Sequence, residues 1–111
     1  MSHPPPNESL AELSDVLGVE NVRTLVRTFL RDFPVSIDDL SKGDRKNCHR
    51  FAHSMKSNAR LMGAFELSRH MAELEERLSN DSGGLVTPED IAAIRAEFTI
   101  VSAPLRVFVA E

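Results

Sequence analysis

Residues 20–44 read ENVRTLVRTFLRDFPVSIDDLSKGD. Apolar side chains recur in this stretch at spacings of three and four residues, at Val22, Leu25, Val26, Phe29, Leu30, Phe33, Ile37 and Leu40. Such spacing lines up one apolar stripe, so the sequence predicts an amphipathic helix over about residues 20–41. Pro34 lies inside this helix and is expected to kink or interrupt it. Gly43 and Asp44 then predict its end and the N-cap of the next helix.

Two further helices are predicted directly after Gly43 by the same spacing. Their apolar stripes are Cys48, Ala52, Met55, Ala59 and Met62 in the first, and Leu67, Met71, Leu74 and Leu78 in the second. The stripes predict helices over about residues 45–62 and 64–80, separated at Gly63. Residues 80–84, with the sequence NDSGG, predict a loop after the second of them.

A last long helix is predicted from Thr87 onward. Thr87 and Pro88 are typical of an N-cap and a first helical position, and two acidic residues follow them. The apolar stripe consists of Ile91, Ile94, Phe98, Val101, Leu105 and Phe108. Because this stripe continues past Pro104, the sequence predicts one kinked helix and not two separate elements.

The N-terminus is predicted to hold a leader and a short helix. Residues 1–7 include three consecutive prolines and are expected to form a flexible leader. Asn7 is a suitable N-cap for a helix over residues 8–17, which ends at Gly18. No segment alternates with period two, and short loops between long helices make neighbouring helices antiparallel. Residues 8–111 are therefore predicted to form one all-α domain, an antiparallel up-and-down four-helix bundle with a short additional N-terminal helix.

Composition narrows the classes of function. The chain has 111 residues, enough for one domain, and a net charge of −4, which argues against general binding of nucleic acid. Neither tyrosine nor tryptophan is present to stack on bases. Cys48 is the lone cysteine, which excludes an internal disulfide and a cysteine-based zinc site and fits a reducing cytoplasm.

Targeting signals are also missing from the sequence. The opening residues MSHPPPNES lack the basic and apolar regions of a signal peptide, and no apolar run approaches the roughly 18 residues of a membrane span. We therefore expect a soluble cytoplasmic protein that binds no membrane. Met1 and the leader favour a stand-alone protein, while a domain excised from a longer chain stays open.

The outward side of the predicted helix over residues 45–62 is basic. His53, within the segment AHSMKSNARLMGA of residues 52–64, lies about 140° from the centre of the apolar stripe and therefore points outward. The same broad side carries His49, Arg50, Lys56, Ser57 and Arg60. No carboxylate occurs between Asp44 and Glu66. A basic face on a chain of negative net charge predicts an anionic partner.

His53 and Lys56 are three residues apart, so their side chains are neighbours on the helix surface. Two cations at this spacing cost stability unless an anion bridges them, and a phosphoryl group on a ring nitrogen would do so. A solvated face with a chance histidine is an equally open interpretation. Ser57 is small and would give another protein's active site clearance near His53. Leu61 points outward and is either an ordinary surface leucine or the apolar centre of a docking patch.

The same helix also carries a pair of histidines with the spacing of a metal site. His49 and His53 have the four-residue spacing of a helical two-histidine site. Arg50 lies between them, and the H-E-x-x-H pattern is absent. We therefore predict no metal ligands here. His70, on the next helix, flanks the apolar stripe and is interpreted as a surface or boundary residue.

The segment Ala52-His53-Ser54-Met55-Lys56-Ser57, followed by Gly63-Ala64, resembles the signature of histidine-containing phosphotransfer (HPt) domains. In that signature the histidine is followed by an apolar residue at two, lysine at three, glycine or serine at four, and glycine at ten. The likeness extends to Phe29-Leu30…Pro34 and Leu67…Leu74-Glu75, and covers roughly residues 8–110. Ser57 stands where glycine is commoner, and the link from Phe29 to His53 is about one helical turn short for the family.

The resemblance implies a multistep His-Asp-His-Asp phosphorelay. His53 accepts a phosphoryl group from the aspartate of a response-regulator receiver domain and passes it to another receiver, while Lys56 offsets the phosphoryl charge. His49, Arg50, Ser57, Arg60, Leu61 and Gly63 are expected to form the surface that binds the partner. A hybrid sensor histidine kinase is a further expected partner. No cofactor is expected, because the Mg²⁺ ion belongs to the receiver, and the protein is expected to be a monomer without kinase activity of its own.

The sequence leaves two alternative functions open. A pseudo-HPt module would bind a receiver or kinase without carrying phosphate, and a small metal-binding bundle would use His49. The sequence identifies neither the cognate kinase and receivers nor the direction of phosphate flow or the downstream output.

Overall fold

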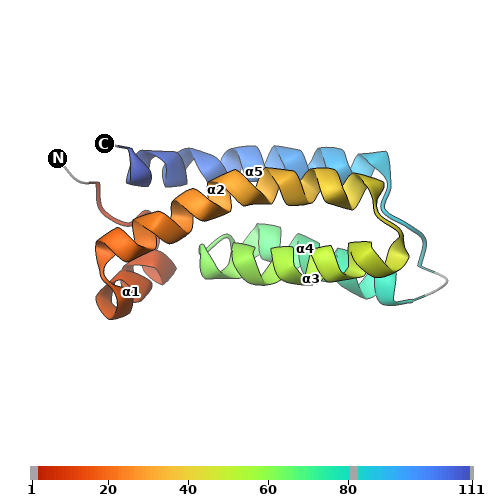
Figure 1. The fold of residues 1–111 in the computed structure, drawn as a ribbon, viewed down its shortest axis with the longest axis horizontal. Helices are drawn as coiled ribbons and strands as arrows, with labels where there is room; N and C mark the ends of the chain where they lie inside the picture. The colour runs from red at the N-terminus through yellow and green to blue at the C-terminus, as the bar shows by residue number, and fades with distance from the viewer. Residues whose placement is uncertain (1–2, 81–82, 111) are drawn as a thin grey trace.

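Helices account for nearly all of the residues that the computed structural model describes, 3–80 and 83–110 (Figure 1). In chain order the helices are α1 (Glu8–Leu17), α2 (Val19–Lys42), α3 (Arg45–Leu61), α4 (Phe65–Ser79) and α5 (Pro88–Val109). No strand occurs within the described ranges. The prediction of an all-α fold with a short additional N-terminal helix is therefore confirmed.

The four long helices form a bundle, and the whole molecule is about 50 Å long (Figure 1). The most extensive packing joins α3 to α4, and the next joins α2 to α5. A smaller contact joins α2 to α3, and the α4–α5 contact is the smallest of the four. Helix α1 packs against α2 at one end of the bundle. Helices α3 and α5 therefore lie diagonally across the bundle and present their outward sides in different directions.

The helix ends agree with the signals in the sequence. Asn7 accepts a hydrogen bond from the Leu10 amide at 2.9 Å, and Asp44 accepts one from the Asn47 amide at 2.9 Å. Thr87 and Asp90 form a reciprocal capping box at the start of α5. Each predicted helix is thus confirmed within one or two residues of its expected bounds. The predicted loop at residues 80–84 includes residues 81 and 82, which lie outside the described ranges.

Neither proline divides its helix. Pro34 lies within α2 and Pro104 within α5, and both helices continue on either side. Each proline removes one backbone donor. Apolar side chains on both sides of it, such as Phe33 and Ile37 around Pro34, are buried in the core and hold the helix in place. The expected continuity of α5 is confirmed, and α2 is not interrupted.

The core combines aromatic rings from α2 and α5 with small and flexible residues from α3. Phe29, Phe33 and Phe98 form a cluster with ring centroids 5.0–5.8 Å apart. On α3 the buried side chains are Cys48, Ala52, Met55 and Ala59. Small buried side chains such as the two alanines allow neighbouring helices to approach α3 closely. Every predicted stripe residue is buried or packs against the core.

The N-terminal segment contacts the bundle at two points. The His3 carbonyl accepts a hydrogen bond from Arg23 Nη2 at 3.0 Å, and Asn7 Nδ2 donates to the Met62 carbonyl at 2.9 Å. Arg23 is buried, and its guanidinium lies 5.0 Å from the centroid of the Phe108 ring. These contacts fix the entry of the chain into α1. Residues 1 and 2 of the predicted leader, and residue 111 of the predicted domain, lie outside the described ranges.

No helix in the described parts of the chain is long and apolar enough to cross a membrane.

Candidate functional site

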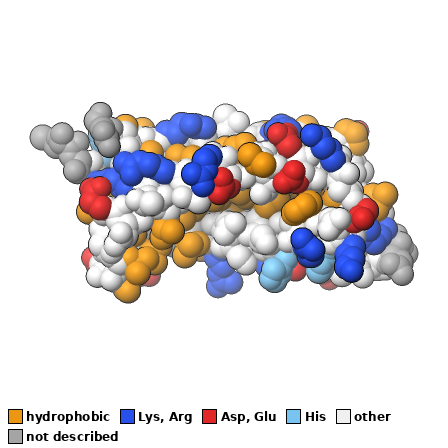
Figure 2. All heavy atoms as spheres, in the orientation of Figure 1, with side chains coloured by type: hydrophobic (Ala, Val, Ile, Leu, Met, Phe, Trp, Pro, Cys, Tyr) orange, Lys and Arg blue, Asp and Glu red, His pale blue; other side chains and the backbone are white. Residues whose placement is uncertain are grey.

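His53 lies on the outward side of α3, with its side chain 61% exposed. Its helical neighbours Ala52 and Met55 are buried in the core, so α3 is held in the bundle by one side and presents the imidazole on the other. Figure 2 shows histidine side chains next to lysine and arginine side chains along the edge of the molecule formed by α3. This agrees with the basic outward side that the sequence predicted.

A carboxylate from the neighbouring helix α4 bridges His53 and Lys56. Glu75 Oε2 lies 2.6 Å from His53 Nδ1, and Glu75 Oε1 accepts a hydrogen bond from Lys56 Nζ at 2.6 Å. The Glu75 side chain is only 16% exposed. The two cationic groups of α3 are therefore joined by an anion that belongs to the protein itself, and the repulsion expected from their spacing is offset.

The Glu75 carboxylate stays ionised over a wide pH range. The hydrogen bond from Lys56 lowers the pKa of Glu75 below its ordinary value of 4.5, and the weaker hydrogen bond from His53 acts in the same direction against the effect of burial. An ionised carboxylate can only accept hydrogen bonds. His53 Nδ1 must therefore carry the proton that it shares with Glu75.

This hydrogen bond decides which nitrogen of His53 can react. In a neutral imidazole one ring nitrogen is a donor and the other holds a lone pair. Since Nδ1 is the donor to Glu75, the lone pair lies on Nε2. The site therefore consists of an exposed nucleophilic nitrogen, a carboxylate that orients the ring from behind, and an ammonium group beside it.

Lys56 is anchored more firmly than an ordinary surface lysine. Its side chain is 31% exposed, and its backbone carbonyl accepts a hydrogen bond from Ser68 Oγ of α4 at 3.0 Å. The ammonium is thus held at the α3–α4 boundary next to His53, where a second anion could share it with Glu75.

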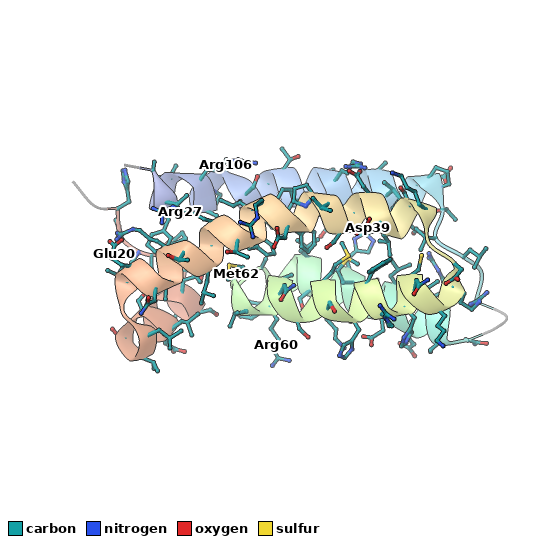
Figure 3. The ribbon with its side chains drawn as sticks, in the orientation of Figure 1. Glu20, Arg27, Asp39, Arg60, Met62 and Arg106 are labelled. Atoms are coloured by element: carbon teal, nitrogen blue, oxygen red, sulfur yellow. The ribbon has the colours of Figure 1, made fainter. Side chains whose placement is uncertain are left out.

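The remaining predicted site residues lie either along the outward side of α3 or at the C-terminal end of that helix. Arg50, Ser57 and Arg60 are exposed on the His53 side of α3, and His49 is half-buried one turn before it. In Figure 3 the Arg60 side chain points away from the bundle. These residues surround His53 as the sequence predicted, although their contribution to partner binding stays a prediction.

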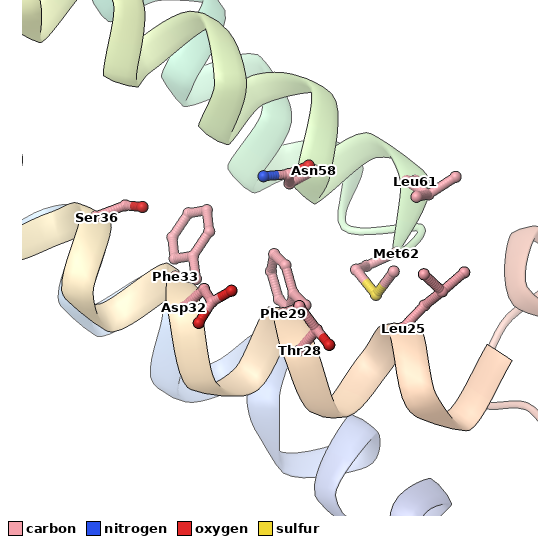
Figure 4. A pocket seen from close by; sticks show the side chains of 9 residues that line it. All are labelled: Leu25, Thr28, Phe29, Asp32, Phe33, Ser36, Asn58, Leu61 and Met62. Atoms are coloured by element: carbon pink, nitrogen blue, oxygen red, sulfur yellow. The ribbon is translucent and has the colours of Figure 1, made fainter. Parts of the chain in front are cut away.

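Leu61 borders a groove between α3 and α2. Its side chain is 45% exposed, and the groove has a volume of about 130 Å³ (Figure 4). The groove is lined by Leu25, Thr28, Phe29, Asp32, Phe33, Ser36, Asn58, Leu61 and Met62. His53 itself does not line this groove, and Leu61 lies eight residues further along α3, about 12 Å at the rise of an α-helix.

Gly63 lies furthest from His53 along the chain among the predicted site residues. It lies ten residues further along, roughly 15 Å at the rise of an α-helix. Its φ of +79° lies in the left-handed region, and a Cβ atom there would come within 2.5 Å of the Asn7 side chain. These facts give Gly63 a structural role in the turn between α3 and α4.

His70 and a possible metal site are the two remaining features that the sequence pointed to. His70 is half-buried, and its Nδ1 lies 2.6 Å from Glu97 Oε1 of α5, so it is a boundary residue that connects two helices. Among residues 3–80 and 83–110, no group of three or more His, Cys, Asp or Glu side chains is arranged to hold a metal ion.

Sequence reasoning did not assign a role to Glu75, although a signal for it exists. His53 lies ten residues before Gly63, and Glu75 lies eleven residues after Ala64. In an antiparallel pair of helices, residues equally far from the turn lie at the same height. Two adjacent cations on one helix and a carboxylate at the same height on the next therefore predict a contact.

Comparison with known protein families agrees with this site. The family model for the Hpt domain matches residues 24–103, which is 80 of the 111 residues and includes His53, Lys56 and Glu75. The chain therefore belongs to the Hpt domain family, whose members are helical bundles that take part in two-component phosphorelays through phosphohistidine. A search of curated proteins and a search of solved structures found no significant match.

Proposed function

We propose that this protein is the histidine phosphotransfer intermediate of a multistep phosphorelay, with His53 as the residue that is phosphorylated. The observation that carries the proposal is the 2.6 Å contact between His53 Nδ1 and Glu75, which leaves the exposed Nε2 as the nucleophile. The donor is the phosphorylated aspartate of a receiver domain, and the acceptor is the aspartate of another receiver.

The transfer is a displacement at phosphorus. The Nε2 lone pair of His53 forms the N–P bond, and the O–P bond to the receiver aspartate breaks, so that the carboxylate leaves with the electron pair. The ring then holds both the phosphoryl group on Nε2 and the proton on Nδ1, which makes it cationic. Glu75 stabilises this cation without taking its proton, and in the reverse step a neutral imidazole leaves.

Lys56 and Glu75 have different tasks in this proposal. Lys56 acts on the transferring group, because its ammonium can turn from Glu75 toward the phosphoryl oxygens and offset their charge. Glu75 is a positioning residue that fixes the tautomer and the ring orientation. The receiver supplies the Mg²⁺ ion, so the bundle itself needs no cofactor.

The partner binds around His53 on the surface already described. Leu61 and the groove between α2 and α3 offer an apolar contact, and Arg50, Arg60 and His49 offer basic groups to the acidic cluster of a receiver. Ser57 leaves room for the partner's backbone next to His53. Gly63 supports the end of α3, and a direct contact of Gly63 with the partner is a further part of the proposal.

We also propose that the protein depends on a separate kinase. A hybrid sensor histidine kinase would be the origin of the phosphoryl group, in the cytoplasm, and the bundle would not phosphorylate itself from ATP. The sequence contains no Walker-type or other glycine-rich phosphate-binding motif that would support such activity.

The test is incubation with a receiver that carries a labelled phosphoryl group on its aspartate. The wild-type protein should acquire label that is labile in acid and stable in base, as expected for phosphohistidine. The His53→Gln variant should acquire none, and the matched control His70→Gln, which lies outside the proposed binding surface, should acquire label like the wild type.

Two results would contradict the assignment. Label on His53→Gln at the wild-type level would mean that another residue is the acceptor. A wild-type protein that binds the receiver and acquires no label would support the pseudo-HPt alternative, in which the bundle binds its partner without carrying phosphate.

A further inference from the structure

The side chain of Asn7 makes one hydrogen bond to each of two helices. Its Oδ1 accepts from the Leu10 amide at 2.9 Å and caps the start of α1. Its Nδ2 donates to the Met62 carbonyl at 2.9 Å, at the end of α3. Both contacts are possible because an asparagine carries an acceptor and a donor on one short side chain. Asn7 therefore connects the start of α1 to the end of α3.

The Met62 carbonyl lies in the last turn of α3, where helix carbonyls have no donor within the helix. The turn provides donors for some of them itself. The Ala64 amide donates to the Ala59 carbonyl at 2.9 Å, and Gly63 has a φ of +79°, as in a Schellman motif. The Met62 carbonyl follows these groups in the chain, and Asn7 supplies its donor. The end of α3 is thus completed by a side chain from the N-terminal segment.

The turn between α3 and α4 lies directly against the Asn7 side chain. A Cβ atom at Gly63 would come within 2.6 Å of Oδ1, Cγ and Nδ2 of Asn7. The packing toward α5 is looser, because a pocket of about 130 Å³ is lined by Pro6 and Asn7 on one side and Leu105 of α5 on the other. The contact with the turn therefore holds Asn7 more closely than packing against α5 does.

The segment that carries Asn7 is fixed at both of its ends. Arg23 Nη2 donates to the His3 carbonyl at 3.0 Å, and Arg23 is itself buried. Residues 4–6 are prolines, whose φ angles are fixed by their rings. A short and stiff segment thus joins the buried arginine to Asn7, and the end of α3 is tied to the body of the protein through it.

The carbonyl that Asn7 holds belongs to a residue of the groove between α2 and α3. Met62 and its neighbour Leu61 line this groove together with Leu25 of α2, and the three side chains lie at the same end of it (Figure 4). Helix α1 packs against α2. The cap on α1 and the bond to α3 therefore both bear on this end of the groove.

We infer that Asn7 is a positioning residue for receiver binding. By holding the Met62 carbonyl, it keeps the last turn of α3, with Leu61, in the position that forms the groove. The inference rests on the proposed function, in which a receiver docks over Leu61 and this groove. Without the bond the turn opens more often, and the receiver binds only the fraction of molecules in which the groove is formed. The contact of His53 with Glu75 does not involve Asn7.

Amide hydrogen exchange tests the local role of Asn7 without any receiver. Asn7→Asp retains a cap acceptor and loses the donor to α3, and Asn7→Ser retains a cap acceptor, adds no charge and is too short to reach α3. Both variants should lower the protection of the Gly63 and Ala64 amides about three- to tenfold, the effect of one hydrogen bond. Asn21→Asp, which removes a bond of the same kind to the Leu17 carbonyl of α1, should leave these two amides unchanged.

Receiver binding tests the consequence for docking. The probe is a receiver from which the wild-type protein acquires label on His53. Its affinity for Asn7→Asp and for Asn7→Ser should be about three- to tenfold lower than for the wild type. The rate of transfer at a saturating receiver concentration should stay within about twofold. A lower affinity with an unchanged rate is expected of a residue that shapes the docking surface and does not act on the reacting atoms.

Three results would overturn the inference. An equal loss of protection along the whole of α3 would show that Asn7 contributes only to overall stability. Unchanged protection of the Gly63 and Ala64 amides would show that Asn7 does not hold the turn. Unchanged receiver affinity would show that the turn does not shape the docking surface. In each case label on His53 of the wild type leaves the proposed function intact, whereas a wild type without label contradicts that function, and with it a role of Asn7 in docking.

Discussion

The outward sides of α3 and α5 are both exposed to solvent, yet their residues are of opposite kinds. Around His53 the outward side of α3 carries basic and small polar groups, and Leu61 is its one large apolar residue. The twelve exposed residues of α5 include four alanines, Ile100 and Val107, and only three of the twelve are charged. The inward sides of the two helices are alike in that both supply buried apolar residues to one core. The fold therefore constrains the inward residues of both helices and leaves the outward residues free to differ.

The largest effect is expected from removing the ammonium group on the α3 side. Lys56→Ala should lower the rate of phosphoryl transfer to His53 by about 100-fold, because one preorganised cation is lost from the transition state. Binding of the unphosphorylated receiver should change less than threefold. Single-turnover labelling and a binding titration measure the two effects. Lys42→Ala, which removes a lysine from the end of α2, is the matched control, and an equal loss in both variants would refute the role of Lys56.

Gly63→Ala tests whether the end of α3 has a structural role that is separate from the reactive side of the helix. The substitution should lower the free energy of unfolding by about 1–2 kcal/mol, because alanine is strained at a φ of +79° and its Cβ meets the Asn7 side chain. Asn7 cannot move aside freely, since it caps α1 and donates to the Met62 carbonyl. Urea denaturation measures the loss. Unchanged stability would contradict the structural role of Gly63 in the turn, whatever the effect of the substitution on receiver binding.

Leu61→Asp should weaken receiver binding about tenfold, because it places a charge at the edge of the apolar groove between α2 and α3. Transfer at a saturating receiver concentration should be nearly unchanged, since Leu61 does not contact the reacting atoms. Calorimetric titration measures the affinity. Val35→Asp, which changes an exposed apolar residue of α2 in the same way, is the control. If both variants bind like the wild type, the groove is not part of the docking surface.

The smallest effect is the contribution of Glu75 to stability. The pKa of Glu75 is lowered in the folded protein by its hydrogen bonds from Lys56 and His53. Its ionised form therefore stabilises the fold at pH values above 4.5, and this contribution is lost as the pH falls through the lowered value.

The comparison of Glu75→Gln with the wild type tests this sign. The variant should be less stable by about 1 kcal/mol or less near pH 7, and the difference should shrink below pH 4.5. Thermal unfolding across the pH range measures it. The neighbouring and exposed Glu76→Gln should show no such trend, and a difference that grows as the pH falls would contradict the assignment.

Local sequence patterns predicted the helices because each helix depends on neighbouring residues. The stripe spacings, the caps at Asn7, Asp44 and Thr87, and the glycine at position 43 act over a few positions and appear as expected. The position of His53 on the outward side follows from the same helical periodicity. These features do not require knowledge of which helix lies next to which.

The features that the sequence did not reveal depend on the relation between helices. Glu75 reaches His53 and Lys56 only because α3 and α4 pack closely in one register. The groove beside Leu61 needs α2 at a particular distance from α3. The exposed alanines of α5 lie outside its inward stripe, so the apolar spacing does not single them out. An apolar pattern shows which residues face the core, and packing determines what the other residues can do.

Phosphorylation of uniformly ¹⁵N-labelled protein by its receiver, followed by nitrogen–proton correlation spectra of the histidine rings, tests the proposed site most directly. We predict that the unphosphorylated His53 ring carries its proton on Nδ1, and that phosphorylation places the phosphoryl group on Nε2 of His53 and of no other histidine. A phosphoryl group on Nδ1 of His53 would contradict the role of Glu75, and one on His49 or His70 would contradict the assignment of the residue.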